Sequence, residues 1–354
     1  MVDTIRKDET LLYQTTYASS IDDTLQQKVS KLKNFCDFRN LQGESFWQAT
    51  AGVVTVQEGK VFTGSDMTHE SMRTPIQHIE FTKRMLTSKP ICWGTYVDDL
   101  AELRAGIKLG GVYVRNAMAS FEQQIDKMIY NAFFKDVQIN AQDSSQTSGL
   151  DKIKFFKVGS AIDLRSLAKA RTHLTAIEQR ALYCACDSFF KEGLLYSTEA
   201  TSRDYSNILA LVAGSVEKFL DTTFIQLASN LIPKIAYTLT ETNSVMNIPT
   251  LTGSKPIYDT KALKAKQVQF FPIFAKDSII LGTLKPLATH IQADPSMRYK
   301  TSIYAEQDMG AIRAVDELVG CFVMTPDDMT GINKIKFTAG SAFGNAKEAV
   351  INLL

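Results

Sequence analysis

The chain has 354 residues, of which 45% are hydrophobic, 10% aromatic and 22% charged. This balance is typical of a globular protein and excludes a disordered chain, whose hydrophobic content would be lower. The 39 basic and 38 acidic residues give a formal net charge of +1, with no local run of basic residues. Because a protein that holds nucleic acid by its own field normally carries a basic face or tail, this balance argues against a dedicated nucleic-acid binder.

The five cysteines are scattered, and an odd number in a long chain does not suggest a disulfide framework. We therefore expect folding in a reduced, intracellular compartment. Cys184 and Cys186 form the only close pair, and no second Cys or His pair lies at metal-ligand spacing, so no metal site is predicted. The chain start lacks the apolar core of a secretion signal, and no stretch of about 18 apolar residues predicts a membrane span.

The N-terminal region divides into two predicted parts. Residues 1–18 are polar and predict a mobile arm unless another subunit holds them. From Ser20, apolar residues recur at steps of three or four and predict a helix of about four turns. Its apolar stripe comprises Ile21, Leu25, Val29, Leu32 and Phe35. That stripe needs a partner surface.

Two extended stretches follow. Residues 46–64 contain β-forming valines on both sides of a Glu58-Gly59 turn, and residues 76–96 form a second extended stretch. Together they predict a long two-stranded projection from the rest of the chain, which we call the excursion. Because an isolated hairpin is marginal in water, it should lie on its own body or on a neighbour. The alternative is an ordinary surface hairpin of a compact domain.

The clearest helix is predicted over about 112–134, after Gly110 and Gly111. Its apolar stripe predicts a structural spine, and its core candidates are Val114, Met118, Phe121, Ile125 and Ile129. The polar tract 140–149 predicts a loop between two halves. In the second half, helices and strands interleave without a regular alternation, which favours an α+β fold over a doubly wound one.

The sequence contains no set of residues in a pattern typical of a catalytic site. Common phosphate-binding, dinucleotide-binding, zinc and hydrolase signatures are absent, and the four histidines are dispersed. Two S-x-x-K matches occur, at Ser30 with Lys33 and at Ser166 with Lys169, without the other elements of that hydrolase class. We predict no catalytic residue, no cofactor and no enzyme. An S-x-x-K serine hydrolase is the alternative from a different class, and a structural or assembly protein is favoured.

Three blocks of sequence resemble a family of tailed-phage major capsid proteins. Residues 25–33, LQQKVSKLK, are similar to the family's QQ-x-x-S-K-L-R opening. Residues 96–100, YVDDL, with 114–117 and 124–129, resemble its aspartate-containing entry and long central helix. The third block is 202–208, SRDYSNI, with the segments that follow it to Pro233. The blocks stand in family order.

The resemblance implies the fold named for phage Hong Kong ninety-seven. Its parts would be an N-terminal arm at 1–45, an extended β-hairpin loop at 46–95, a peripheral domain at 96–155 and 311–354 with the spine helix, and an axial domain at 156–310. No Lys–Asn crosslink can be assigned, and the placement of 329–354 stays open.

The same resemblance implies a major capsid protein that self-assembles into pentamers and hexamers of an icosahedral head around double-stranded DNA, held by weak, non-specific contact. It would reside in the virion after assembly in the host bacterial cytoplasm, with scaffolding, portal and decoration proteins as further partners and no membrane. An encapsulin-type shell protein is the alternative. The candidate inter-subunit contacts are Ile21, Leu25, Val29, Val54, Val56, Glu58, Gly59 and Val61.

Overall fold

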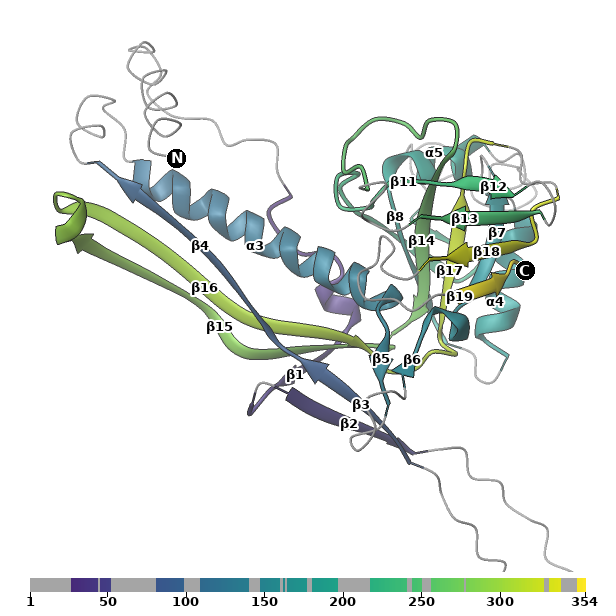
Figure 1. The fold of residues 1–354 in the computed structure, drawn as a ribbon, viewed down its shortest axis with the longest axis horizontal. Helices are drawn as coiled ribbons and strands as arrows, with labels where there is room; N and C mark the ends of the chain where they lie inside the picture. Colours follow the sequence, from purple (N-terminus) through teal and green to yellow (C-terminus); the bar gives the residue numbers. More distant parts are fainter. Residues whose placement is uncertain are drawn as a thin grey trace, which may run out of the picture.

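The protein is seen here as a computed structural model with two connected parts (Figure 1). One part, the spine region, consists of helix α3 lying along a narrow sheet. The other, the body, is a β-rich globule with two short helices. This mixture confirms the α+β fold. The residues that the structure describes are 27–43, 45–51, 81–98, 109–139, 147–159, 162, 164–176, 180–196, 217–240, 244–249, 256–276, 278–327, 331–338 and 349–354.

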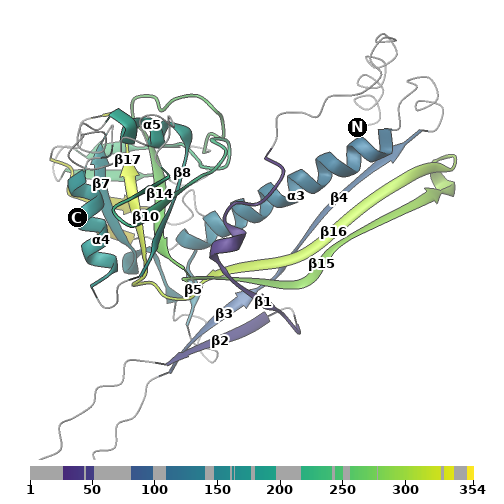
Figure 2. The same cartoon turned by 180° about the vertical axis from the view of Figure 1, so that it is seen from behind.

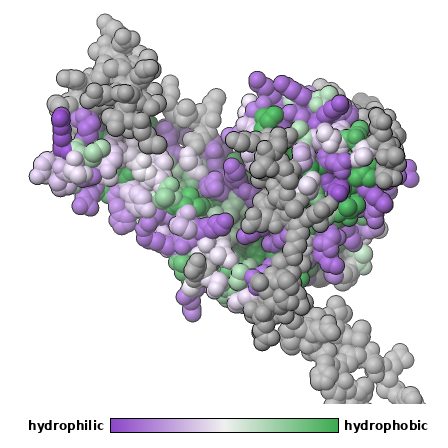
Figure 3. Space-filling model, viewed as in Figure 1, coloured by the Kyte–Doolittle hydropathy of each residue, from purple (hydrophilic) through white to green (hydrophobic). Residues whose placement is uncertain are grey.

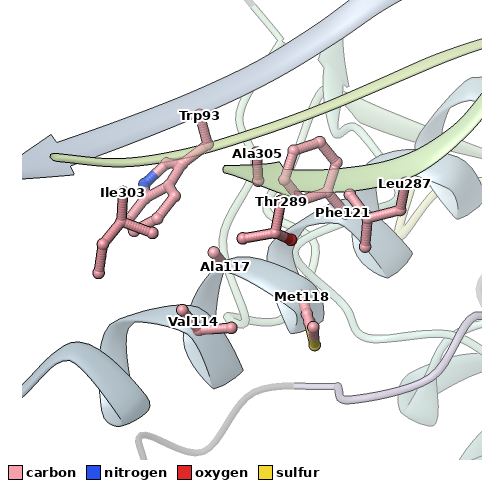
Figure 4. Close-up of a pocket in the computed structure, with 9 residues that line it drawn as sticks. All are labelled: Trp93, Val114, Ala117, Met118, Phe121, Leu287, Thr289, Ile303 and Ala305. Atoms are coloured by element: carbon pink, nitrogen blue, oxygen red, sulfur yellow. The ribbon is translucent and has the colours of Figure 1, made fainter. Parts of the chain in front are cut away.

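Helix α3 (Leu109–Phe134) has 26 residues and spans about 39 Å at 1.5 Å per residue. Phe121, Ile125 and Ile129 are buried, whereas Val114 is half-buried. Met118 differs from the prediction, because 44% of it is exposed. The N-terminal half of α3 lies on one narrow sheet that covers only one side of it. Figure 4 shows Met118 pointing away from the strands, while Ala117 faces them.

The sheet of the spine region has the order β1-β15-β16-β4. Strand β1 runs parallel to β15, and the other neighbours are antiparallel. Between this sheet and α3 lies a cavity of about 10 Å³, too small for a ligand. The strands are β1 (Asp37–Asn40), β15 (Ile279–Asp294), β16 (Lys300–Arg313) and β4 (Lys89–Val97).

The predicted excursion begins and ends in an antiparallel pair, β2 (Ser45–Ala51) with β3 (Phe81–Thr87). The second extended stretch is divided, however, because β4 leaves β3 after Ser88 and pairs with β16 instead. Gly310 of β16 permits this crossing, since a Cβ there would lie 2.4 Å from the carbonyl oxygen of Thr87.

The body is built on a mixed sheet with the order β7-β17-β14-β8-β10-β9, and β11 joins β14. Its strands are β7 (Lys154–Gly159), β17 (Val319–Met324), β14 (Gln267–Ala275), β8 (Leu182–Cys186), β10 (Thr222–Gln226), β9 (Lys218–Phe219) and β11 (Ile235–Ala236). Helices α4 (Leu164–Leu174) and α5 (Ser188–Tyr196) flank it.

A second sheet, of order β12-β13-β18-β19, completes the body. It comprises β12 (Thr238–Thr240), β13 (Val245–Ile248), β18 (Lys334–Phe337) and β19 (Ala349–Asn352). The small pair β5 (Val137–Gln138) and β6 (Thr147–Ser148) follows α3. Three short 3-10 turns complete the described elements, at Lys33–Phe35, Leu150–Lys152 and Pro295–Met297.

Phenylalanines dominate the core of the body, and the C-terminal end of α3 enters it. The ring centroids of Phe271 and Phe190 lie 4.7 Å apart, and those of Phe133 on α3 and Phe274 lie 4.8 Å apart. On the face seen in Figure 3, hydrophilic and hydrophobic side chains are interspersed over the outside of the body. The helix therefore links the two parts through shared packing.

The elements group differently from the expected residue ranges. Strands β15 and β16 lie with α3 rather than with the rest of 156–310, whereas β17, β18 and β19 lie in the body rather than with α3. The chain crosses between the parts several times, because each sheet takes strands from distant segments. The expected division already split the peripheral domain into 96–155 and 311–354, and as a division into domains it stays a prediction.

The predicted helix over 20–35 also differs. In the described portion, residues 27–32 are not helical, and a 3-10 turn at Lys33–Phe35 follows. Leu32 is fully buried and Phe35 packs against the core, but Val29 is 66% exposed. Contacts with α3 explain why residues 27–32 do not form the predicted helix.

Candidate functional site

Residues 27–32 are anchored to α3 by one buried carboxylate, that of Asp126. Its Oδ1 accepts hydrogen bonds from Ser30 Oγ at 2.6 Å and from the backbone nitrogen of Leu32 at 3.0 Å. The backbone nitrogen of Lys31 lies 3.1 Å from Oδ2, to which Gln27 Nε2 also donates. We call this set the Asp126 anchor.

The anchor explains why a helix does not run through these residues. A buried carboxylate must be hydrogen-bonded, and backbone N–H groups are strong donors to an anion. Groups that would otherwise bond within a helix are instead directed at Asp126. One turn earlier on α3, Glu122 accepts from the backbone nitrogen of Ser30 at 3.0 Å. Residues 30–32 are therefore held against α3 at two positions, Glu122 and Asp126.

The anchor joins two of the sequence blocks that resemble the capsid family. Gln27, Ser30 and Leu32 belong to the first block, and Asp126 belongs to the helix block almost a hundred residues later. A charged residue in an amphipathic helix is expected on its polar face, so periodicity does not predict the burial of Asp126. Only its place between two buried isoleucines, Ile125 and Ile129, hinted at a buried role.

A second cluster, the junction cluster, consists of Arg84, Arg313 and Asp316. Arg84 of β3 donates to both carboxylate oxygens of Asp316, at 2.9 and 2.8 Å. Arg313, which is fully buried, also donates from Nε to Asp316 and from Nη1 to the carbonyl oxygen of Phe133 at 2.5 Å. That carbonyl lies in the last turn of α3, where helix acceptors lack partners. The cluster joins the base of the excursion to α3 and to the end of β16.

The far end of the β15–β16 hairpin carries exposed apolar side chains that the sequence analysis missed. Tyr299 is 71% exposed and Ile291 is 64% exposed, and Met297 is also exposed. Arg298 and Tyr299 adopt positive φ angles of 57° and 58°, in the left-handed region that favours glycine. The turn signal at Asp294-Pro295-Ser296 could have located this tip.

The predicted contact candidates are distributed unevenly. Val29 lies next to an open groove of about 700 Å³ beside the anchor. The other candidates lie outside the described residues: Ile21, Leu25, Val54, Val56, Glu58, Gly59 and Val61. They remain predictions.

Neither S-x-x-K serine is arranged as a nucleophile activated by its lysine. Ser30 Oγ donates to Asp126, and Ser166 Oγ donates to the carbonyl oxygen of Lys157 at 2.9 Å. Within the described ranges, no three His, Cys, Asp or Glu side chains gather as a metal site would require. The described helices also include none that is long and apolar enough to cross a bilayer.

Comparison with known proteins agrees with this architecture. The chain matches a family model described as phage capsid protein over residues 10–321. No curated protein matches it in sequence.

The solved structures with a similar fold include phage capsids of low sequence identity. A capsid structure of Helicobacter pylori bacteriophage KHP30 is 9% identical, with a TM-score of 0.62, covering 88% of this chain and 95% of that chain. The cyanophage P-SCSP1u capsid is 14% identical, with a TM-score of 0.59 and coverages of 88% and 93%. A structure from Mycobacterium phage Che8 is 14% identical, with a TM-score of 0.57 and coverages of 86% and 95%. The chain therefore belongs to the phage capsid protein family and is a major capsid protein, a structural component of the icosahedral head of a tailed phage.

Proposed function

We propose that copies of this chain join head to tail into pentamers and hexamers, and that these rings close a shell around double-stranded DNA in the host bacterial cytoplasm. A head-to-tail contact joins two different surfaces of neighbouring copies and closes into a ring when the rotation allows it. The observation that carries the proposal is the exposed, strained tip of the β15–β16 hairpin, far from the body (Figure 2).

The strain at this tip needs a compensating gain. A residue other than glycine in the left-handed region costs roughly 1–2 kcal/mol. The other adjacent pair with positive φ, Leu220 and Asp221, is compensated within the chain, because Leu220 packs against the core and Asp221 pairs with Lys218 at 3.0 Å. Arg298 and Tyr299 instead hold their side chains out in solvent.

A second copy of the chain is the partner that fits this tip. Tyrosine, methionine and arginine are enriched at protein interfaces, and tyrosine and arginine are also enriched among the residues that dominate the binding energy. The tip contains all three residue types, Met297, Arg298 and Tyr299, at the end of the long β15–β16 hairpin. Burying it on a neighbour would repay the backbone strain and add contact area that a compact body cannot reach.

The domain roles follow the expected ranges with the regrouping described above. We assign the N-terminal arm to 1–45 and the extended loop to 46–95. The rest of the spine region, with α3, β15 and β16, would form the peripheral domain, and β1 and β4, near the ends of the arm and loop ranges, pair with its sheet. The body would form the axial domain, which meets its copies at the centre of each ring. Scaffolding, portal and decoration proteins are further proposed partners.

Negative-stain electron microscopy of the purified full chain tests the assembly. Closed polyhedral shells or rings of five and six are expected, and a chain that stays monomeric at every concentration and salt would contradict the proposal. A second variant tests the loop. Because Ala51 and Phe81 are paired in register, residues 52–80 can be replaced by an Asn-Gly turn without disturbing β2 and β3. This variant should fold but form no regular shells, and regular shells from it would refute the contact role of the loop.

A further inference from the structure

A pocket of about 260 Å³ lies between α4 and the C-terminal strands of the body. It has a cationic wall. Lys157 comes from β7, and Arg165 and Lys169 come from α4. The rest of the lining is Ser166, Ile332, Asn333, Leu353 and Leu354. The sequence shows no basic run here, because these three cations are separated along the chain and only the fold brings them together.

Among the described residues, one negative group lies in this pocket, the chain-end carboxylate of Leu354, which accepts from the backbone nitrogen of Lys157 at 3.3 Å, and the three cations outnumber it. The ion pairs that the described part of the chain forms do not include Lys157, Arg165 or Lys169. Elsewhere on the same helix the pattern differs, since Arg171 lies 4.0 Å from a carboxylate oxygen of Asp221. The charge at the pocket is therefore a local property and not a general feature of α4.

The spacing of these cations is unfavourable unless an anion joins them. Arg165 and Lys169 are four residues apart on α4, so they are neighbours on one face, and a like-charge pair at this spacing destabilises an isolated helix. Lys157 adds a third charge from the adjacent strand. Its Nζ donates to the carbonyl oxygen of Ile332 at 3.3 Å, and an ammonium group has three N–H donors.

We propose that this pocket binds phosphate groups, and that their source is the backbone of the enclosed nucleic acid. A guanidinium group and two ammonium groups are the donors that proteins use for phosphate. Their long side chains recognise charge and not base sequence, which suits a protein that encloses any genome. The inference rests on the proposed shell and adds to it a direction, because the face of the body that carries α4 would then meet the nucleic acid.

The primary test uses the unassembled full-length chain and a short double-stranded DNA of mixed sequence. Fluorescence anisotropy is measured over a series of salt concentrations for the wild type and for the double variant Arg165→Gln/Lys169→Gln. Each lost phosphate contact reduces the slope of log K against log salt by about 0.9. The double variant should therefore lower that slope by about 2. An unchanged slope would overturn the proposal.

A matched control removes the same charge elsewhere. Lys261 and Lys264 are exposed and do not line the pocket. The variant Lys261→Gln/Lys264→Gln should leave the salt slope close to that of the wild type. An equal reduction in both variants would mean that only net charge matters, and it would overturn the assignment to this pocket.

Two further measurements separate the remaining possibilities. Titration with inorganic phosphate alone distinguishes the source: phosphate binding that the pocket variant loses, with DNA binding unchanged, would overturn the assignment to nucleic acid. Electron microscopy of the pocket variant should show normal shells, because the substitutions lie away from the hairpin tip and the excursion. Normal shells with an unchanged DNA slope would overturn this inference alone, whereas a wild type without shells would overturn the proposed function.

Discussion

The body and the spine region bury their strands to very different extents. In the body, all six residues of β17 are buried, and so is nearly all of β14. In the spine region, β4 alternates between exposed and half-buried residues. Strand β15 shows both behaviours in one element, since its first five residues are buried beside the body and most of the rest are exposed.

This difference indicates that the body supplies the stability of the single chain and that the spine region supplies surface for assembly. The body encloses its phenylalanine core within one chain, so its sheet needs no partner. Among the described residues, α3 lies along one side of the distal half of the spine sheet (Figure 1), and Ile291, Met297 and Tyr299 at the tip are exposed. A sheet with apolar residues at its free end is a surface that another copy can complete.

The largest expected effect tests whether the middle of helix α3 is part of the hydrophobic core. Phe121→Asp places a charge at a position that is 3% exposed, and an unpaired buried charge is among the most destabilising changes known. We expect loss of soluble folded protein, measured by circular dichroism and size-exclusion chromatography.

The matched control lies on the same helix. Met118→Asp puts the same charge at an exposed position less than one turn away and should leave the chain folded. Soluble, shell-competent Phe121→Asp protein would contradict the buried-spine interpretation.

The next effect tests the junction cluster, which joins the base of the excursion to α3 and to the end of β16. Arg313→Ala removes one of the two arginines that pair with Asp316, and it removes the donor to the carbonyl oxygen of Phe133. Arg84 still pairs with Asp316, so we expect the loss of about 1–3 kcal/mol that follows from leaving a buried acceptor without its donor, measured by urea unfolding. The exposed Arg39, paired with Asp37 at 2.8 Å, is the control, and Arg39→Ala should cost less than about 1 kcal/mol. Equal losses would contradict a special role for the junction.

A more local effect is expected at the Asp126 anchor. Asp126→Asn removes the charge to which Ser30, Lys31 and Leu32 donate, at a cost of about 1–3 kcal/mol. Hydrogen exchange should accelerate at the backbone amides of Lys31 and Leu32 and change little in β14. Glu122→Gln is the milder comparison, because Glu122 accepts from Ser30 alone among these amides. Unchanged exchange at Lys31 and Leu32 would mean that the anchor does not hold the segment.

Asp187 is one of the buried polar groups in the body that lack a hydrogen-bond partner among the described residues, and its ionisation makes the effect visible through pH. Asp187 caps α5 through a bond from the backbone nitrogen of Phe190 to Oδ1 at 2.8 Å, but its buried Oδ2 has no hydrogen-bond partner among the described residues. Burial raises the pKa of Asp187 above its usual value. Ionisation of Asp187 therefore destabilises the folded state. The stability that comes from the protonated carboxyl is fully present below the unfolded-state pKa and is lost as pH rises through the raised pKa of the folded state.

Asp187→Asn keeps a good cap without the charge. Its advantage over the wild type in thermal unfolding should be absent in acid and grow as pH rises above the ordinary aspartate range. A constant difference across that range would show that ionisation of Asp187 is not the cause.

The sequence predicted local periodicity well and long-range hydrogen bonds poorly. Phe121, Ile125 and Ile129 repeat at four-residue steps, so the α3 helix could be read directly. The helix predicted through Val29 was wrong in its described part, because Asp126 competes for its backbone N–H groups from almost a hundred residues away. Met118 was misplaced because periodicity gives a face but not the width of the surface that covers it. The β15–β16 hairpin was missed since exposure interrupts its alternation beyond Thr283.

The smallest effect on stability has the opposite sign and separates the two regions most sharply. Tyr299→Gly relieves one left-handed residue and should stabilise the unassembled chain by up to about 1 kcal/mol. The same change removes the most exposed aromatic side chain of the tip and should reduce the yield of closed shells. Leu220→Gly is the comparison, because it relieves the same backbone conformation but removes a side chain packed on the core, so it should not raise stability and should spare assembly per folded chain. If Tyr299→Gly assembles as well as the wild type, the strained tip is not an assembly contact, and the incompleteness of the spine region must be met elsewhere along β4 or β15.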